Sequence, residues 1–211
     1  MGFTLLIGDI YKMIEQIKEM MKIQNKLNNH LDKKWMKKDW NFSLASDVEM
    51  VEAIEHYGWK WWKHQECDID QVKMELVDIW HFLLSGIIVE KMDPERVKDA
   101  LEEGFQNLND YDFIRKTTMF LKYHTFVRKI QVLAGCMDSI DMSFDELRTL
   151  YLGKSILNLF RWNNGYNDGT YIKVWDGLED NEYLTSILMC HPDAPADEIY
   201  NMLEERYRKI V

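Results

Sequence analysis

The chain has 211 residues and a formal net charge of −10 at pH 7. Hydrophobic residues make up 46% of it, enough for a buried core, while 10 glycines and 3 prolines are too few for the turns of a β-sandwich or barrel. An acidic chain lacks the phosphate attraction that drives non-specific binding to nucleic acids. We therefore expect an all-α protein, built as a helical bundle, that binds no nucleic-acid polymer.

The cysteines and the apolar stretches bear on the cellular location of the protein. The 3 cysteines lie far apart and form no Cys-x-x-Cys pair, which argues against a disulfide framework and a zinc–thiolate site. The longest apolar stretch, residues 79–89, is interrupted by His81 and Ser85 and is too short to span a membrane. We expect a soluble, cytoplasmic protein without a membrane partner.

The predicted elements are helices from end to end. Apolar spacing predicts the first helix over residues 9–29, and a basic, aromatic stretch follows as a loop with short helical pieces. Asn41 and Asp68 are good N-caps, and Asp93 stands before a proline suited to the first helical position. The later helices are predicted to begin or run as follows: after Asn41 to about Tyr57, from Asp68 to about Lys91, from Asp93, and over 109–135, 143–162 and 197–210.

The stretch after Arg161, RWNNGYNDGTYIKVWDGLEDN, differs from its surroundings because it is rich in Asn, Gly and Asp. This composition predicts a loop with a short extended piece, which we expect to close over a bound ligand. We expect one all-α domain over residues 1–211. Its core helices would lie at about 9–106 and 143–211, with a middle helical insertion at about 107–142.

Two short segments each carry a pair of acidic residues three positions apart, Glu49 with Glu52 and Glu75 with Asp78. Residues three apart lie on one face of a helix. Asp78 falls within the apolar run LVDIWHFLLSGIIV, where an isolated buried anion is costly. Two such helices can surround a hard cation with oxygen ligands, as Mg²⁺ prefers, although acidic pairs are also common on solvated faces.

The aspartate of the second acidic pair has a competing interpretation. The string DIWH at 78–81 has the carboxylate-x-x-His form found in di-iron helix bundles. Those bundles use a Glu-x-x-His from each of two helices, and the sequence contains no second copy. We therefore consider a di-iron site the weaker alternative.

A stripe of polar residues marks the helix predicted at 143–162. Lys154, Asn158 and Arg161 stand at i, i+4 and i+7, so they share one face. Two cations beside an amide can bind a polyphosphate, but the same spacing suits an ordinary solvated face. The string GKS at 153–155 is not a P-loop, because the required glycine five residues earlier is replaced by Arg148 and no strand precedes it.

Taken together, these segments resemble the dimeric all-α dUTPases, relatives of the MazG-like pyrophosphatases. The strings IQNKLN, ExxE, GWKWWK, ELVDIWHFLL and YLGKSILNLFRWNNGYNDGTYIKVWDGLEDNEYL follow one another in the family's order. DIWHF together with NGYxDGxYxKxWxGxEDN is the most specific part. The resemblance implies an all-α homodimer that hydrolyses dUTP to dUMP and pyrophosphate with Mg²⁺.

The resemblance also implies roles for single residues. Glu49, Glu52, Glu75 and Asp78 would hold Mg²⁺, and Glu49 would also orient the attacking water, a task that Glu52 or Glu55 could share. The implied substrate-binding residues are Gln24 and Asn28 at the uracil edge, Trp59, His81 and Phe82 around the nucleoside, and Lys154, Asn158, Arg161, Asn164, Tyr166 and Lys173 at the phosphates.

Alternatives within and beyond this reaction stay open. The dUTPase could also hydrolyse dUDP. The chain could instead be a broader dNTP pyrophosphatase that takes dCTP as well as dUTP, because a single amide flip at Gln24 or Asn28 would change which pyrimidine is accepted. A non-catalytic helical module that only binds nucleotide is a different class, and the intact acidic quartet argues against it. Residues 30–45 look shorter and more basic than the family pattern, which bears on fine specificity.

Overall fold

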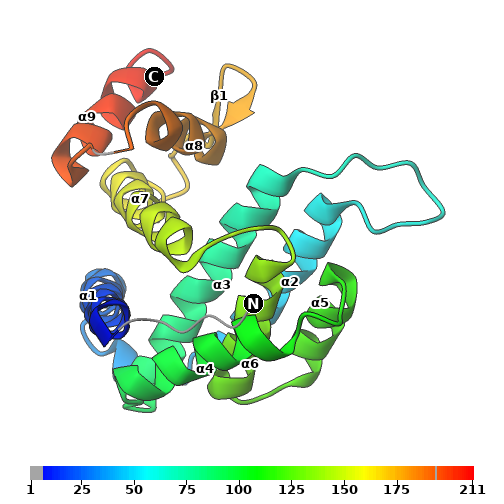
Figure 1. The fold of residues 1–211 in the computed structure, drawn as a ribbon. Helices are drawn as coiled ribbons and strands as arrows, with labels where there is room; N and C mark the ends of the chain where they lie inside the picture. Colours follow the sequence, from blue (N-terminus) through cyan, green and yellow to red (C-terminus); the bar gives the residue numbers. More distant parts are fainter. Residues whose placement is uncertain (1–6, 193) are drawn as a thin grey trace. The chain divides into compact units, whose positions relative to one another are not determined.

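The computed structural model describes the backbone of residues 7–192 and 194–211, with side chains described from Tyr11 onward (Figure 1). About 70% of the chain is helical and almost none of it is sheet, which confirms the all-α prediction. The chain divides into two compact units, Met1–Leu147 and Arg148–Val211, and the expected insertion at 107–142 lies inside the first. Among the described residues, none of the helices combines the length and apolar character needed to span a bilayer.

Two helices of the first unit begin at the N-caps that the sequence predicts. Asn41 accepts a hydrogen bond from the backbone N–H of Leu44 (2.9 Å), and Asp68 accepts one from Gln71 (3.1 Å), so both act as N-caps. The elements are α1 (Ile7–Leu31), the 3-10 turn η1 (Trp35–Lys37), α2 (Phe42–Tyr57), α3 (Ile69–Val89), α4 (Pro94–Asn107), α5 (Phe113–Lys122) and α6 (Phe126–Asp138).

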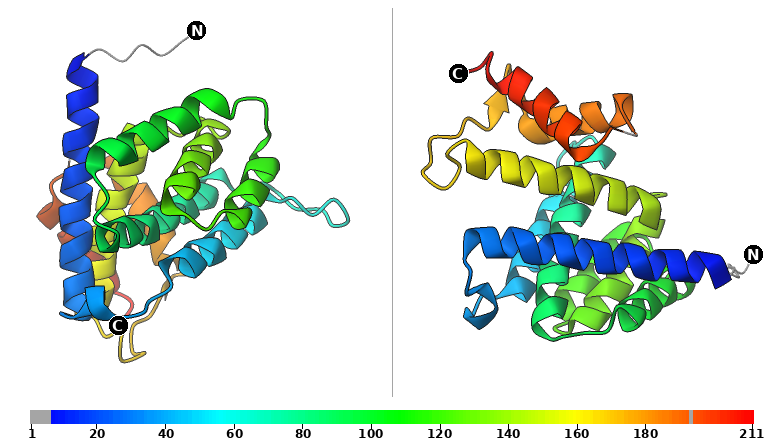
Figure 2. Two further views of the ribbon diagram at one scale, coloured as in Figure 1. Left: turned by 90° about the horizontal axis from the view of Figure 1, so that it is seen from below. Right: turned by 90° about the vertical axis from the view of Figure 1, so that its left-hand side faces the viewer.

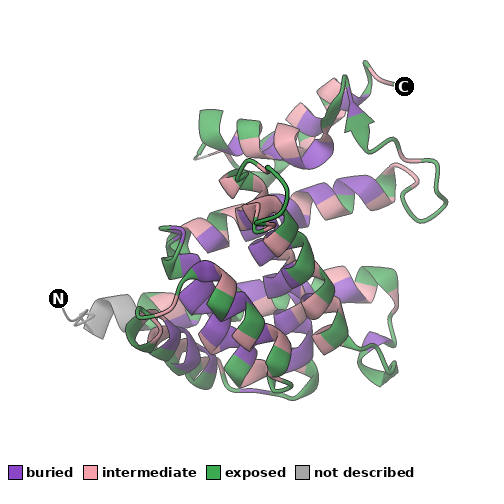
Figure 3. Ribbon diagram, turned by 90° about the vertical axis from the view of Figure 1, so that its right-hand side faces the viewer, coloured by how far each residue is buried: buried purple, intermediate pink, exposed green. Residues whose placement is uncertain are grey.

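Helix α3 is the centre of this unit. Its apolar run is buried on nearly all sides because α1, α2 and α6 pack around it (Figures 1 and 2). Trp80 is fully buried and its indole N–H points to the sulfur of Met20 on α1 at 3.4 Å. In Figure 3 the helices of this unit alternate between buried inner positions and exposed outer ones, as amphipathic helices do.

The prediction of one helix over residues 109–135 is wrong, because the structure has two helices there, α5 and α6. Tyr123 ends α5 with extended backbone (ψ 140°), and Thr125 begins α6 in the same region (ψ 138°). The chain therefore reverses so that α6 packs against both α5 and α4. Gly104 permits the close approach of α4, since a Cβ there would lie 2.1 Å from the backbone oxygen of Gln131.

The second unit carries most of α7 (Phe144–Asn163), the strands β1 (Val174–Trp175) and β2 (Leu178–Glu179), and the helices α8 (Asp180–Cys190) and α9 (Ala196–Tyr207). The two strands pair antiparallel, with Trp175 opposite Leu178. Asp176 and Gly177 both have positive φ (48° and 89°), which suits the tight turn that joins the two strands. This hairpin is the short extended piece predicted after Arg161.

Candidate active site

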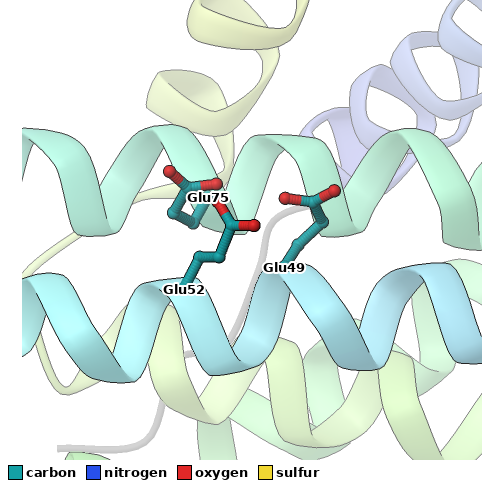
Figure 4. Close-up of side chains that lie close together, drawn as sticks. All are labelled: Glu49, Glu52 and Glu75. Carbon is teal, nitrogen blue, oxygen red and sulfur yellow. The ribbon is translucent and has the colours of Figure 1, made fainter.

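Three carboxylates from two neighbouring helices converge in the first unit. Glu49 and Glu52 point from α2 toward α3, where Glu75 lies (Figure 4). One oxygen from each of the three lies within 4.8 Å of the others. Glu75 is buried, with 7% of its surface exposed, whereas Glu52 is exposed. Carboxylates this close repel one another unless a cation or a proton lies between them, and an all-oxygen donor set fits a hard divalent cation.

The fourth predicted ligand, Asp78, does not belong to this group of converging oxygens. It follows Glu75 by three residues on α3 and is half-buried. Two residues three apart share a helix face but point about 60° apart around the axis. Because the side chain of aspartate is also one methylene shorter than that of glutamate, Asp78 extends less far from α3 than Glu75.

The structure adds His56 to the neighbourhood of these carboxylates. Its Nε2 lies 3.6 Å from Oε1 of Glu75. Sequence reasoning missed this residue, although His56 follows Glu49 and Glu52 at helical spacing and so shares their face of α2. Glu55, by contrast, bonds Nζ of Lys60 at 2.5 Å, and this bond lowers the pKa of Glu55 and makes its carboxylate a weaker base.

A buried cluster of polar side chains lies between α1 and the second half of α3. The amide nitrogens of Gln24 and Asn28 both donate to Oγ of Ser85, at 3.1 and 2.9 Å. Gln24 also donates to Oδ1 of Asn28 (3.0 Å) and accepts from Nδ1 of His81 (2.7 Å). The hydroxyl of Ser85 donates to the backbone oxygen of His81 at 2.9 Å. All four side chains are buried. We call these four residues the amide cluster.

Sequence reasoning found three members of the amide cluster and missed the fourth. Ser85 entered only as an interruption of the apolar run. Its position four residues after His81 was the available signal, because residues at i and i+4 share a helix face. The polar residues of α1 that it meets lie about sixty positions away in sequence, at Gln24 and Asn28.

The second unit contains a buried hub of charged and polar side chains. Arg161 donates through Nε and Nη2 to the two carboxylate oxygens of Asp180, at 2.8 and 2.7 Å. Lys154 donates to Oδ1 of Asn181 (2.9 Å), and the hydroxyl of Tyr171 donates to Asp180 (2.8 Å). Burial, and then the charge of Asp180, raise the pKa of the Tyr171 phenol. Lys154 and Arg161 are both buried, so their stripe is not an ordinary solvated face.

A family comparison bears directly on this chain. The model of the dUTPase family matches residues 16–166, which is more than half of the sequence and includes both acidic pairs and the amide cluster. The chain belongs to the all-α dimeric dUTPase family. It is therefore a hydrolase, a dUTP diphosphatase, from a family that typically uses a divalent metal. A search of curated proteins found no match to the chain.

Two residues that the dUTPase resemblance places around the nucleoside lie at different distances from the amide cluster. Phe82 is half-buried and follows His81 on α3. Trp59 is 38% exposed and lies on the loop that leaves α2 and extends away from the helices before α3 begins (Figure 1). From the start of α3 to His81 the helix rises about 18 Å, so Trp59 lies away from the amide cluster of its own chain.

The remaining residues expected at the phosphates of dUTP lie around the hub of the second unit. Oδ1 of Asn158 accepts from Nη1 of Arg161 at 3.3 Å. The guanidinium carbon of Arg161 lies 5.8 Å from the ring centre of Tyr166, which is 48% exposed. Asn164 caps the end of α7 by donating to the backbone oxygen of Phe160, and Lys173 pairs with Glu179 at 2.8 Å. Sequence reasoning missed Asp180, Asn181 and Tyr171, although all three lie within the motif that carried the resemblance.

Proposed function

We propose that this dUTPase cleaves dUTP to dUMP and pyrophosphate with Mg²⁺ held by Glu49, Glu52, Glu75 and Asp78. The observation that carries the proposal is the convergence of three carboxylate oxygens from two helices within 4.8 Å. Such a group is costly without a cation, and Mg²⁺ prefers oxygen donors of this kind. Asp78 would complete the set through a change of its side-chain rotamer.

The reaction follows from the properties of these side chains. Held by these carboxylates, Mg²⁺ would supply positive charge against the triphosphate and would make a nearby water more acidic. Glu49 orients the attacking water and accepts its proton, with Glu52 beside it as the exposed member of the group. The water oxygen forms a bond to one of the two phosphorus atoms joined by the α–β bridge, and the bond from that phosphorus to the bridging oxygen breaks, which separates dUMP from pyrophosphate. Glu75 is buried beside His56, so its position is fixed before substrate arrives.

The residues proposed to recognise the substrate are described for each unit by itself. Gln24 and Asn28 carry amides, which offer both a donor and an acceptor to the edge of uracil. His81 and Phe82 would line the nucleoside, whereas the ring contact described for Trp59, with Trp62, does not bear on this role. The proposed phosphate ligands are all in the second unit: Lys154, Asn158, Arg161, Asn164, Tyr166 and Lys173. The Gly-rich loop among them, residues 163–181, would close over the triphosphate and exclude water.

The direct test is turnover of a panel of dNTPs and dUDP, with and without Mg²⁺, with identification of products. Glu49→Gln should reduce hydrolysis of dUTP by roughly a hundredfold or more, the loss typical for a general base, while the helical signal persists. Glu15→Gln is the control, because that exposed carboxylate pairs with Lys18 on α1. Near-normal turnover of Glu49→Gln, or turnover without any divalent cation, would contradict the proposal. Hydrolysis of dCTP at the rate of dUTP would favour the broader enzyme.

A homodimer is part of the same proposal. Helix α2 exposes an apolar stripe, Leu44, Val48 and Val51, with exposed fractions of 57%, 49% and 49%. The loop that follows α2 exposes Trp61 and Trp62 as well. Exposed apolar side chains grouped in this way are typical of interaction surfaces, and tryptophan is enriched there. Sedimentation of the purified protein should give twice the mass of the chain, and the mass of a single chain would contradict this part.

A further inference from the structure

The hydroxyl of Ser85 makes as many hydrogen bonds as a serine hydroxyl can make. A serine hydroxyl has one hydrogen to donate and two lone pairs to accept with. The hydrogen goes to the backbone oxygen of His81, one helical turn earlier, at 2.9 Å. The two lone pairs receive the amide N–H groups of Gln24 and Asn28 at 3.1 and 2.9 Å. Because Ser85 is only 1% exposed, water cannot easily replace any of these three bonds.

Two other contacts within the amide cluster are compatible with either orientation of its amides. If Gln24 and Asn28 both flipped, the bond between them would survive with donor and acceptor exchanged. The bond from His81 to Gln24 would also survive, because a neutral imidazole can move its proton and accept at Nδ1. Both amide orientations are therefore compatible with these two contacts.

Among the hydrogen bonds described within the amide cluster, those to Ser85 distinguish the two orientations. After a joint flip, Oγ of Ser85 would face two amide oxygens with a single hydrogen available. It could bond one of them only by releasing the carbonyl of His81, and the other oxygen would remain buried without a donor. An unsatisfied buried acceptor is costly, so Ser85 favours the orientation in which both amides turn their nitrogens toward it.

We propose that Ser85 is a specificity-determining residue, which holds the amides of Gln24 and Asn28 in the orientation that reads uracil and thereby excludes dCTP. This inference rests on the proposed role of the two amides in base recognition. Uracil presents a carbonyl oxygen and an N–H where cytosine presents an amino group and a bare nitrogen. The edge that matches one base is therefore mismatched to the other unless an amide flips.

The test compares Ser85→Ala with the wild type in the ratio of kcat/KM for dCTP to that for dUTP. Loss of the hydroxyl removes the preference between the two amide orientations, so this ratio should rise about tenfold, the effect expected for one unsatisfied buried group. Calorimetric binding of dCMP and dUMP gives a second readout that is independent of catalysis, and the same change in relative affinity is expected there.

The chain offers a matched control in Ser155. It is also a buried serine in the middle of a helix, and its hydroxyl donates to the backbone oxygen of Tyr151 four residues earlier at 2.8 Å. Ser155→Ala removes the same group from α7 and should leave the dCTP-to-dUTP ratio unchanged. If Ser85→Ala does not fold, Ser85→Cys keeps the size of the side chain while weakening the acceptor, and its ratio should rise as well.

The outcomes separate this proposal from the proposed function. A wild type that releases no pyrophosphate from dUTP with Mg²⁺ overturns the proposed function itself. A wild type that prefers dUTP, with a Ser85→Ala or Ser85→Cys ratio equal to that of Ser155→Ala, overturns the role of Ser85 alone. A wild type that accepts dCTP and dUTP equally also overturns it, because a fixed amide orientation cannot read both bases.

Discussion

Breaking the buried ion pair of the second unit should destabilise that unit specifically. Asp180 is fully buried and accepts three hydrogen bonds, two from Arg161 and one from Tyr171. Asp180→Asn keeps the shape of the side chain but removes its charge and turns an NH₂ group toward donors. Arg161 is itself only 8% exposed, so solvent would screen its guanidinium charge little once the charge of Asp180 is removed. We expect a loss of about 3–5 kcal/mol, the range for breaking a buried pair from one side.

The assay is hydrogen exchange followed by peptide, because it reports the opening free energy of each unit separately. Peptides from residues 148–211 should lose protection in Asp180→Asn, while those from the first unit keep it. Glu204→Gln is the control in the same unit. Its exposed pair with Arg208 spans one helical turn at 2.9 Å, and removing such a pair should cost about 0.5 kcal/mol or less.

Two results would refute this reasoning. A loss below about 1 kcal/mol in Asp180→Asn would mean that the pair is solvated far more than its burial indicates, since that is the range of surface pairs. Equal loss of protection on both sides of residue 148 would mean that the second unit does not open by itself. A double variant, Arg161→Met with Asp180→Asn, should be less destabilised than the sum of the single variants, because neither charge is then left buried alone.

Three further predictions concern the first unit. Glu75→Gln should abolish binding of Mn²⁺, followed by electron paramagnetic resonance as a substitute for Mg²⁺, while circular dichroism stays that of the wild type; unchanged binding would remove Glu75 from the site. Gly104→Ala should lower the free energy of unfolding in urea by about 1–3 kcal/mol, because the new methyl group would overlap the backbone of Gln131 and force α4 from α6; an unchanged midpoint would contradict this. Burial raises the pKa of the Cys136 thiol to about 12, so at pH 8 a thiol reagent should label the two exposed cysteines in the native protein and reach Cys136 only after unfolding; rapid native labelling of Cys136 would contradict its burial.

The helices were largely predictable because their signals are local. A cap such as Asn41 acts on the next three residues, and apolar periodicity identifies the inner face of a helix without knowledge of its neighbours. The break between α5 and α6 was not predictable in the same way. Tyr123 and Thr125 are neither glycine nor proline, and their extended backbone follows from the packing of α6 against α4 and α5.

The acidic residues illustrate the same limit within the site. Spacing placed Glu49 and Glu52 on one face of α2, and Glu75 and Asp78 on one face of α3, which local geometry suffices to establish. Which of the four oxygens meet depends on how α2 and α3 are rotated about their axes and on side-chain length. Both are consequences of packing in the whole unit, and so the exclusion of Asp78 from the converging group needed the structure.

The amide cluster shows why a polar residue in an apolar run is more informative than it first seems in a sequence. A buried hydroxyl must find partners, so Ser85 in the middle of α3 implied polar groups on a neighbouring helix. Periodicity could supply candidates on α1, since Gln24 and Asn28 stand at i and i+4 and share a face. It could not supply the direction of the bonds, which decides the chemistry. Once the hydrogen of Ser85 is assigned to the carbonyl of His81, the orientation of two amides far away in sequence follows, and in the proposed role of Ser85 base discrimination depends on a residue that need not touch the substrate.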